Sequence, residues 1–377
     1  MECRPSINPS PQPERLHALT SLRFVAAMIV VFRHTTESAG FGWQFIPKFF
    51  IFNFGVSFFF ILSGFILTHI YCHKRVPFAE FIRNRWVRLW PAHVLWLVVM
   101  MVLLPYDWWT YGGTGLFNRW VILGFNIPML QSIVPVYEYF FSWNAVSWSI
   151  STAFFLYLAF YPLLTNLHAT WHWKLISAFV LFVLLSMTRT LPFFDGLNLF
   201  STFPPARVFE FCLGMSAYLL WHKMRNLNFA IIFLILFIAI MVIVKLVHLD
   251  LVSLEQASAA RVHMNILFRT LGVLALACLI IAAAHNESLP WRLLDNRVFV
   301  YLGELSYSLY LCHQIFIRMF ISHGPDSYWA SLSHGWQAII YFPLILVSSM
   351  LSYHLVETPL RKILRNVNFK KLVSAGH

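Results

Sequence analysis

The sequence predicts an all-α integral membrane protein, a polytopic helical bundle of about ten transmembrane helices with both termini in the cytoplasm. Of its 377 residues, 59% are hydrophobic and only 11% are charged, whereas about a quarter of the residues in a typical soluble domain are charged. The apolar runs are numerous, and each is about 20 residues long, the length an α-helix needs to cross a hydrocarbon core of about 30 Å. A membrane β-barrel would show short alternating segments instead.

The apolar runs divide the chain into ten expected spans: 17–36, 51–71, 90–105, 143–165, 173–190, 205–222, 228–247, 266–284, 299–321 and 336–356. The apolar stretch 120–135 is interrupted by Pro128 and Pro135. We therefore expect an interfacial or re-entrant segment there, with an eleventh span as the alternative. Because the spans and their short loops use up the chain, we expect one membrane domain over 17–360. A disordered tail (1–16) would precede it and a basic tail (361–377) would follow it.

The basic residues predict the orientation and exclude some partners. If the N-terminus is inside, most of the 27 Lys and Arg residues lie in the termini and cytoplasmic loops, as the positive-inside rule requires. They are spread over short loops and form no single stripe with a recognition module, so we expect membrane lipids as partners and no nucleic acid. His168 and His172 have the i, i+4 spacing of metal ligands but no carboxylate nearby, and no metal is expected.

Two ionisable residues lie in the first apolar run, Arg23 and His34. Eleven residues at about 100° each make about three full turns, so the two side chains share a helix face, about 16 Å apart along the axis. Such groups at membrane depth usually face a bundle interior or a watery cavity, which favours a functional role. Alternatively, Arg23 snorkels to the inner headgroups and His34 caps the outer end of the helix.

The chain resembles the membrane acyltransferase-3 family, which O-acetylates bacterial surface polysaccharides and some other acceptors. Seven motifs carry the resemblance, in the family's order and over nearly the whole chain: LTSLRFVAAMIVVFRH (19–34), GVSFFFILSGFILT (55–68), RWVRLWP (85–91), SWSIS with FYP (147–151, 160–162), RVFEFCLG (207–214), LGELSYSLYLCH (302–313) and VETP (356–359). The resemblance implies an O-acetyltransferase of the bacterial inner membrane. It implies acetyl-CoA as the donor and a polysaccharide or lipid-linked glycan, such as an exopolysaccharide or O-antigen unit, as the acceptor.

The donor would be held by arginines. Arg85 and Arg88 are three residues apart, on one helix face at the cytoplasmic edge, where planar guanidinium groups can grip phosphates bidentately. Coenzyme A carries such phosphates. The alternative is a positive-inside anchor that binds no ligand. Arg23 is a further candidate, both for donor binding and for stabilising negative charge on the thioester oxygen.

The acceptor hydroxyl would be activated by a histidine. His34 suits removal of a proton near neutral pH, although acylation of His34 itself is an alternative. Ser306, Tyr310 and His313 form a polar stripe at i, i+4 and i+7 of the ninth span, where His313 is either catalytic or a satisfied core residue. Glu357 and Glu210 are candidate orienting carboxylates. With Ser306 and Tyr310, the expected substrate-lining residues are Ser149, Arg207 and Glu210.

One position departs from the family pattern. The WSxSxE stretch of the family usually has glutamate at its sixth position, and here that position is Ala153. This puts the activity of this particular chain in doubt, and we hypothesise that the substitution was engineered. The alternative function is a proton-coupled transporter or flippase, since such carriers also have intramembrane Arg, His and Glu residues. The sequence does not indicate an oligomeric state.

Overall fold

The computed structural model describes residues 16–37, 54–74, 76–106, 114–194, 197–224, 229–253, 259–285, 291–322 and 328–366. In these ranges the chain is helical, and its only strand-like pairing is an isolated bridge between Val136 and Leu197. The long helices are α1 (His17–Glu37), α2 (Gly55–Tyr71), α3 (Phe78–Leu103), α6 (Trp148–Leu164), α7 (Leu167–Met187), α8 (Pro204–Met224), α9 (Ala230–Ser253), α10 (Ala259–Ala284), α12 (Arg297–Ser322) and α14 (His334–Leu351). The all-α prediction is confirmed.

Each of the ten expected spans coincides with one of these helices. Seven helical stretches in the described ranges are long and apolar enough to cross a membrane, and α2 is a shorter apolar helix. The multi-pass membrane class is therefore confirmed, while the number of about ten spans and the cytoplasmic position of the termini stay predictions. Helix α3 begins at Phe78, well before residue 90, where the expected span begins. The first part of the helix contains arginines, so hydropathy did not count it as part of the span although it is helical.

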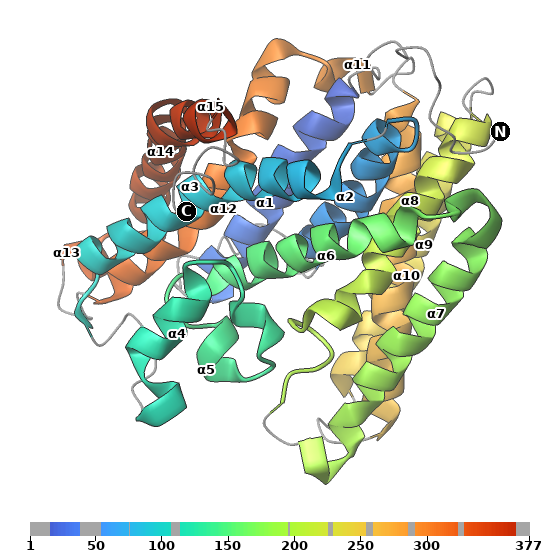
Figure 1. Cartoon of the computed structure of the whole chain (residues 1–377). Coiled ribbons are helices and arrows are strands. Elements are labelled where there is room, and N and C mark those ends of the chain that lie inside the picture. The colour runs from blue at the N-terminus through green and yellow to red at the C-terminus, as the bar shows by residue number, and fades with distance from the viewer. Residues whose placement is uncertain are drawn as a thin grey trace, which may run out of the picture.

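The helices pack in a connected bundle (Figure 1). Helix α1 lies against α12, α2 against α8, and α14 against α12. Helices α7, α9 and α10 stand together on one side of the bundle, where α9 packs on α10 and α7 on α8. The short helices α4 (Arg119–Asn126) and α5 (Tyr137–Phe140) lie at the opposite end from α11 (Trp291–Leu294) and α15 (Thr358–Asn366).

Glycines allow the backbones of α2 and α8 to touch. A Cβ atom on Gly64 would lie 2.1 Å from the carbonyl oxygen of Phe211, and one on Gly214 would lie 1.9 Å from that of Ile61. No side chain fits at such distances, so the two glycines set how closely the helices cross. The crossing also brings Ser57 of α2 to α8, where its hydroxyl donates to Glu210.

The segment 114–147 does not cross the membrane. It consists of α4, α5 and three short 3₁₀ turns, Gly115–Phe117, Gln131–Ile133 and Ala145–Ser147, and none of these is long enough to span a bilayer. Several of its polar side chains are nevertheless fully buried, among them Asn126, Gln131 and Asn144. The expectation of an interfacial or re-entrant segment agrees with this arrangement, and the described residues 114–147 contain no helix long enough for the alternative, an eleventh span.

A six-residue π-helix, Ser352–Glu357, joins α14 to α15. The widened turn places Glu357 inside the bundle, 3% exposed, whereas its neighbour Leu355 is 68% exposed. Helix α15 then covers the first six residues of the expected C-terminal tail. The remainder of that tail, 367–377, and residues 1–15 of the expected N-terminal tail lie outside the described residues.

Candidate active site

Helices α1 and α12 meet at a glycine. A Cβ atom on Gly303 would lie 2.0 Å from the carbonyl oxygen of Thr20, so only glycine allows the two backbones to approach this closely. Further along, His34 of α1 meets His313 of α12. Both residue numbers increase from the Thr20–Gly303 contact to the His34–His313 contact, so α1 and α12 run parallel. The Gly303 contact thereby positions the two histidines.

The two histidines form a hydrogen-bonded pair. The Nδ1 atom of His34 lies 2.8 Å from the Nε2 atom of His313, and the ring planes are 7° apart with centroids separated by 5.1 Å. His313 is fully buried, while His34 is half-buried. The helix-face expectation for His34 is consistent with this inward position, since its ring turns toward α12 and not toward lipid.

The hydrogen bonds determine which nitrogens carry protons. The Nδ1 atom of His313 lies 2.6 Å from the carbonyl oxygen of Tyr310. A carbonyl only accepts, so this nitrogen is the donor and the Nε2 atom of a neutral His313 is an acceptor. The Nδ1 atom of His34 is then the donor of the histidine pair. The Nε2 atom of His34 consequently keeps its lone pair, and no described residue donates a hydrogen bond to it. This is the tautomer that a general base requires.

Tyr310 and Ser149 support the turn of α12 that carries His313. The Tyr310 hydroxyl donates to the carbonyl oxygen of Val146 at 3.1 Å and accepts from the Ser149 hydroxyl at 2.9 Å. All three residues are buried. Ser306, the third member of the expected stripe, donates to the carbonyl oxygen of Gly303 at 2.7 Å within its own helix. The structure thus brings Ser149 and Tyr310 to the histidine pair, whereas Ser306 lies by the α1–α12 crossing.

The arginines predicted to bind the donor gather at the other end of α1. The charges of Arg88 and Glu357 act on Arg23, and the charge of Arg88 acts on Arg85. The Nη2 atom of Arg85 donates to the Tyr71 hydroxyl at 3.1 Å. Among the described residues, Arg23 and Arg88 have no hydrogen-bond or ion-pair partner. The charges of Arg23, Arg88 and Arg361 act on the one carboxylate of Glu357, which leaves an excess of positive charge that suits a polyanionic ligand.

Glu357 is held in this cluster by α12. Its Oε2 atom accepts from the Ser308 hydroxyl at 3.0 Å, and Ser308 also contacts the Ser352 hydroxyl at 3.0 Å. The charges of Arg88, Arg361 and Arg23 act on the carboxylate. Glu357 therefore lies with the arginines and not with the histidine pair. Because Arg23 and His34 are about 16 Å apart along α1, the candidate site has an arginine end and a histidine end.

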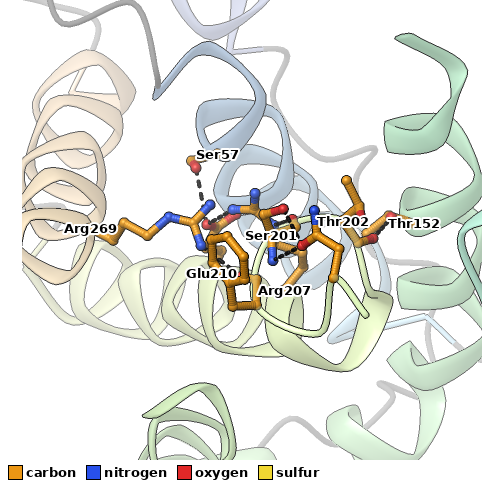
Figure 2. Close-up of polar contacts among 9 residues, drawn as sticks. Ser57, Thr152, Ser201, Thr202, Arg207, Glu210 and Arg269 are labelled. Carbon is orange, nitrogen blue, oxygen red and sulfur yellow. Dashed lines mark hydrogen bonds and ion pairs between the residues drawn. The ribbon is translucent and has the colours of Figure 1, made fainter. Parts of the chain in front are cut away.

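Arg207 and Glu210 form a separate buried network on α8 (Figure 2). The Nη1 atom of Arg207 and the Oε1 atom of Glu210 are 2.5 Å apart, and both side chains are 7% exposed. Ser57 donates to the same oxygen at 3.0 Å, and the Nε atom of Arg207 donates to the carbonyl oxygen of Ser201. Figure 2 shows Arg269 of α10 reaching toward the pair. The network joins α2, α8, α10 and the turn at 201, so its contacts are those of a structural ion pair.

Sequence reasoning did not single out two buried polar residues near the histidines. The Nδ2 atom of Asn144 donates to the carbonyl oxygen of Leu311 at 2.9 Å. The Nε2 atom of His93 in α3 donates to the carbonyl oxygen of Asn126 at 2.8 Å. The sequence feature that could have identified them is an amide or imidazole side chain inside an otherwise apolar stretch. No group of three or more His, Cys, Asp or Glu residues that could hold a metal ion occurs in the described part of the chain, and a metal-free reaction stays a prediction.

Comparison with known proteins decides the family. Residues 16–354 match the family described as an acyltransferase domain, the acyltransferase-3 family. The chain belongs to this family. It is similar to Acyltransferase MdmB from Streptomyces mycarofaciens, with 26% identity over 385 residues and 94% of each chain covered. It is also similar to Nodulation protein 10 from Rhizobium leguminosarum bv. viciae, with 25% identity over 340 residues and 84% of each chain covered. No solved structure matches.

Membership of the acyltransferase-3 family confirms the predicted enzyme class, an acyltransferase, over the transporter alternative. Ala153 of α6 still differs from the glutamate of the family pattern. Ala153 is half-buried and packs against the main apolar core, next to Thr152, whose hydroxyl donates to the carbonyl oxygen of Thr202 at 3.0 Å. Helix α6 itself contains no acidic residue.

Proposed function

We propose that this acyltransferase moves an acetyl group from cytoplasmic acetyl-CoA onto a hydroxyl group of an exported polysaccharide or a lipid-linked glycan, in a bacterial inner membrane. The observation that carries the proposal is the hydrogen-bonded pair of His34 and His313, which leaves a lone pair on the Nε2 atom of His34. The arginines at the other end of α1 support an anionic donor. Acetyl remains the acyl group that the family resemblance favours.

The chemistry follows from the proton positions. The Nε2 atom of His34 takes the proton of the acceptor hydroxyl as its oxygen attacks the thioester carbon. The new C–O bond forms, the C–S bond breaks, and the proton passes to the coenzyme A thiolate. His313 receives a hydrogen bond from the Nδ1 atom of His34 throughout. It therefore orients His34 and stabilises the imidazolium that forms, the part an orienting acceptor plays in other nucleophile and base pairs.

The donor would lie along α1. Its phosphates contact Arg85, Arg88 and Arg23, where bidentate guanidinium contacts favour phosphate. Its thioester lies at the histidine end, about 16 Å further along the helix. A long flexible arm between phosphates and thioester, which coenzyme A has, is what this separation calls for. Arg23 in this arrangement binds the donor and does not touch the thioester oxygen.

The test uses the purified full chain in lipid nanodiscs with radiolabelled acetyl-CoA and an added bacterial polysaccharide as the acceptor. Wild type is expected to release coenzyme A and to label a glycan fraction, and His34→Gln, which keeps a hydrogen-bonding group but not the imidazole base, is expected to do neither. His168→Gln serves as the matched control, because His168 lies on α7 away from α1 and α12. Near-normal transfer by His34→Gln, or transfer of label without release of coenzyme A, would overturn the proposal.

A further inference from the structure

Four buried side chains near the histidine pair offer a hydrogen-bond acceptor that no donor satisfies among the described residues. They are the Nδ1 atom of His93, the Oδ1 atoms of Asn126 and Asn144, and the Oε1 atom of Gln131. Asn144 is 1% exposed and the other three are 0% exposed. Buried polar groups are almost always paired, so four unsatisfied acceptors in one region require an explanation.

The hydrogen bonds assign these atoms as acceptors. The amide nitrogens donate to carbonyl oxygens, Asn126 to Ile122 at 3.0 Å, Asn144 to Leu311 at 2.9 Å and Gln131 to Ser147 at 3.1 Å. Turning an amide around would set two oxygens against each other, so the amide oxygens must be the unsatisfied atoms. The Nε2 atom of His93 donates to the carbonyl oxygen of Asn126, which leaves the Nδ1 atom of the neutral ring as an acceptor.

Contacts between elements place this cluster at the depth of the catalytic histidines. The Tyr307 hydroxyl of α12 donates to the carbonyl oxygen of Leu89 in α3 at 2.7 Å, and the rings of Trp96 and Phe316 are 6.0 Å apart. Helices α3 and α12 therefore run parallel. His93 of α3, between Leu89 and Trp96, is level with the turn of α12 that holds His313.

The segment 118–147 carries Asn126 and Asn144 to this depth. The amide nitrogen of Asn126 donates to the Ser142 hydroxyl at 3.2 Å, two residues before Asn144, and Asn144 in turn donates to α12 at Leu311. Asn126 also accepts from His93 through its backbone. Asn126 therefore lies against α3 and Asn144 against α12 two residues before His313, whereas Gln131 lies by Ser147 and α6.

Backbone strain marks the same segment. Met129 and Trp143 are both fully buried and adopt positive φ angles of 63° and 55°. Bulky residues rarely adopt this conformation, and it persists only where surrounding contacts impose it. One such contact holds Trp143, whose carbonyl oxygen accepts a hydrogen bond from the Nη1 atom of Arg318 at 2.9 Å. A segment held under strain beside unsatisfied acceptors gains from moving when a ligand offers donors.

We propose that these atoms form the subsite for the acyl acceptor, and that the acceptor is a neutral polyhydroxylated molecule. Its hydroxyl groups donate to Asn126, Asn144 and His93 when the segment 118–147 moves away from α3 and α12 to admit it. The indole Nε1 atoms of Trp96 and Trp143 are buried donors in the same elements, so the lining holds more acceptors than donors. Hydroxyl groups both donate and accept and can satisfy both kinds of atom, whereas a phosphate or carboxylate would bring only further acceptors. The anionic donor is bound at the arginine end, so the two substrates are separated by their chemistry.

This subsite rests on the proposed acetyl transfer and adds the identity of the acceptor class to it. One hydroxyl of the bound acceptor lies at the Nε2 atom of His34 and loses its proton there. Its oxygen forms the ester bond as the C–S bond of the thioester breaks, and the thiolate of coenzyme A receives the proton. Asn126, Asn144 and His93 bind the remaining hydroxyls and take no part in proton transfer.

The test measures acetyl transfer by the full chain in nanodiscs to three neutral probes, the methyl glycosides of glucose, galactose and rhamnose, and to the anionic methyl glucuronide. Wild type is expected to use at least one neutral probe and to discriminate against the glucuronide. Asn144→Leu and Asn126→Leu are expected to raise the KM for that probe tenfold or more, while hydrolysis of acetyl-CoA without acceptor stays within twofold of wild type. His93→Gln, which keeps a donor and an acceptor, is expected to retain the wild-type KM within threefold.

A matched control separates recognition from folding. Gln337 of α14 is also buried, but both ends of its amide are satisfied, by the carbonyl oxygen of Trp329 at 2.9 Å and by His334 at 3.2 Å. Gln337→Leu is expected to leave the acceptor KM unchanged. An unchanged KM in both Asn variants, or equal losses of hydrolysis and transfer in them with a lowered melting temperature, assigns the amides a structural role and overturns the inference. Use of none of the neutral probes, or preference for the glucuronide, does the same.

The donor half of the experiment keeps the two proposals apart. A wild type that neither binds nor hydrolyses acetyl-CoA contradicts the proposed function, and the subsite inference falls with it. A wild type that hydrolyses acetyl-CoA in a His34-dependent manner, with an acceptor KM insensitive to Asn144 and Asn126, contradicts the subsite alone.

Discussion

Replacing His313 by Leu tests whether His34 depends on its partner. The substitution places an apolar side chain in a fully buried position and removes the Nε2 acceptor that lies 2.8 Å from the Nδ1 atom of His34. His313→Gln offers an amide oxygen in a similar place, so His34 can keep its donor. We expect His313→Leu to lose most transfer and His313→Gln to keep most of it.

The magnitude follows from the change in that hydrogen bond during the reaction. Between two neutral rings the bond contributes about 0.5–1.5 kcal/mol, and it becomes charge-assisted, contributing about 1.5–3 kcal/mol, once His34 has taken the proton of the acceptor. The difference, about 1–1.5 kcal/mol, is gained only in the transition state and corresponds to about a tenfold change in kcat. Without a partner, His34 also populates the tautomer that has no lone pair on Nε2, so the expected loss is about 10- to 50-fold.

The assay is initial-rate release of coenzyme A by the purified variants in nanodiscs, with a thermal unfolding curve for each. Ser349→Ala is the control, because Ser349 is also fully buried but bonds only to the carbonyl oxygen of Leu346 in its own helix. Transfer by His313→Leu within twofold of wild type would refute the dependence of His34 on His313. Equal losses in His313→Leu and His313→Gln, with equally lowered melting temperatures, would show that His313 only packs.

Three further predictions concern other parts of the site. Arg88→Lys and Arg85→Lys are expected to weaken coenzyme A binding about tenfold in calorimetry, because the ammonium keeps the charge but loses the bidentate contact; affinities equal to wild type would reject the donor assignment. Gly303→Ala is expected to destabilise the protein by about 1–3 kcal/mol and to reduce transfer, because the added Cβ meets the carbonyl oxygen of Thr20 at 2.0 Å; a melting temperature and activity like wild type would contradict the close crossing. Ala153→Glu is expected to raise transfer if the substitution at this position is engineered, and no change in activity or donor binding would reject that hypothesis.

The sequence alone was sufficient for the membrane class and for the helix faces. Composition and run length identify membrane helices because lipid satisfies no backbone group, so apolar spans must be helical. Helix geometry places Arg23 and His34 on one face, and the structure has His34 turned inward to α12 and Arg23 within range of Glu357. The motifs led to the acyltransferase-3 family, to which the chain belongs.

Which faces meet was decided only by the tertiary structure. His34 and His313 are 279 positions apart, and the period of a helix says which residues share a face but not which helix that face will contact. Close contacts such as that of Gly303 with Thr20 settle the partner and the depth. They put Glu357 with the arginines, Ser57 of α2 against Glu210, Asn126 against His93, and Asn144 against α12 two residues before His313. The amides escaped sequence analysis because an apolar run with a few polar residues looks the same whether those residues face water, lipid headgroups or another helix.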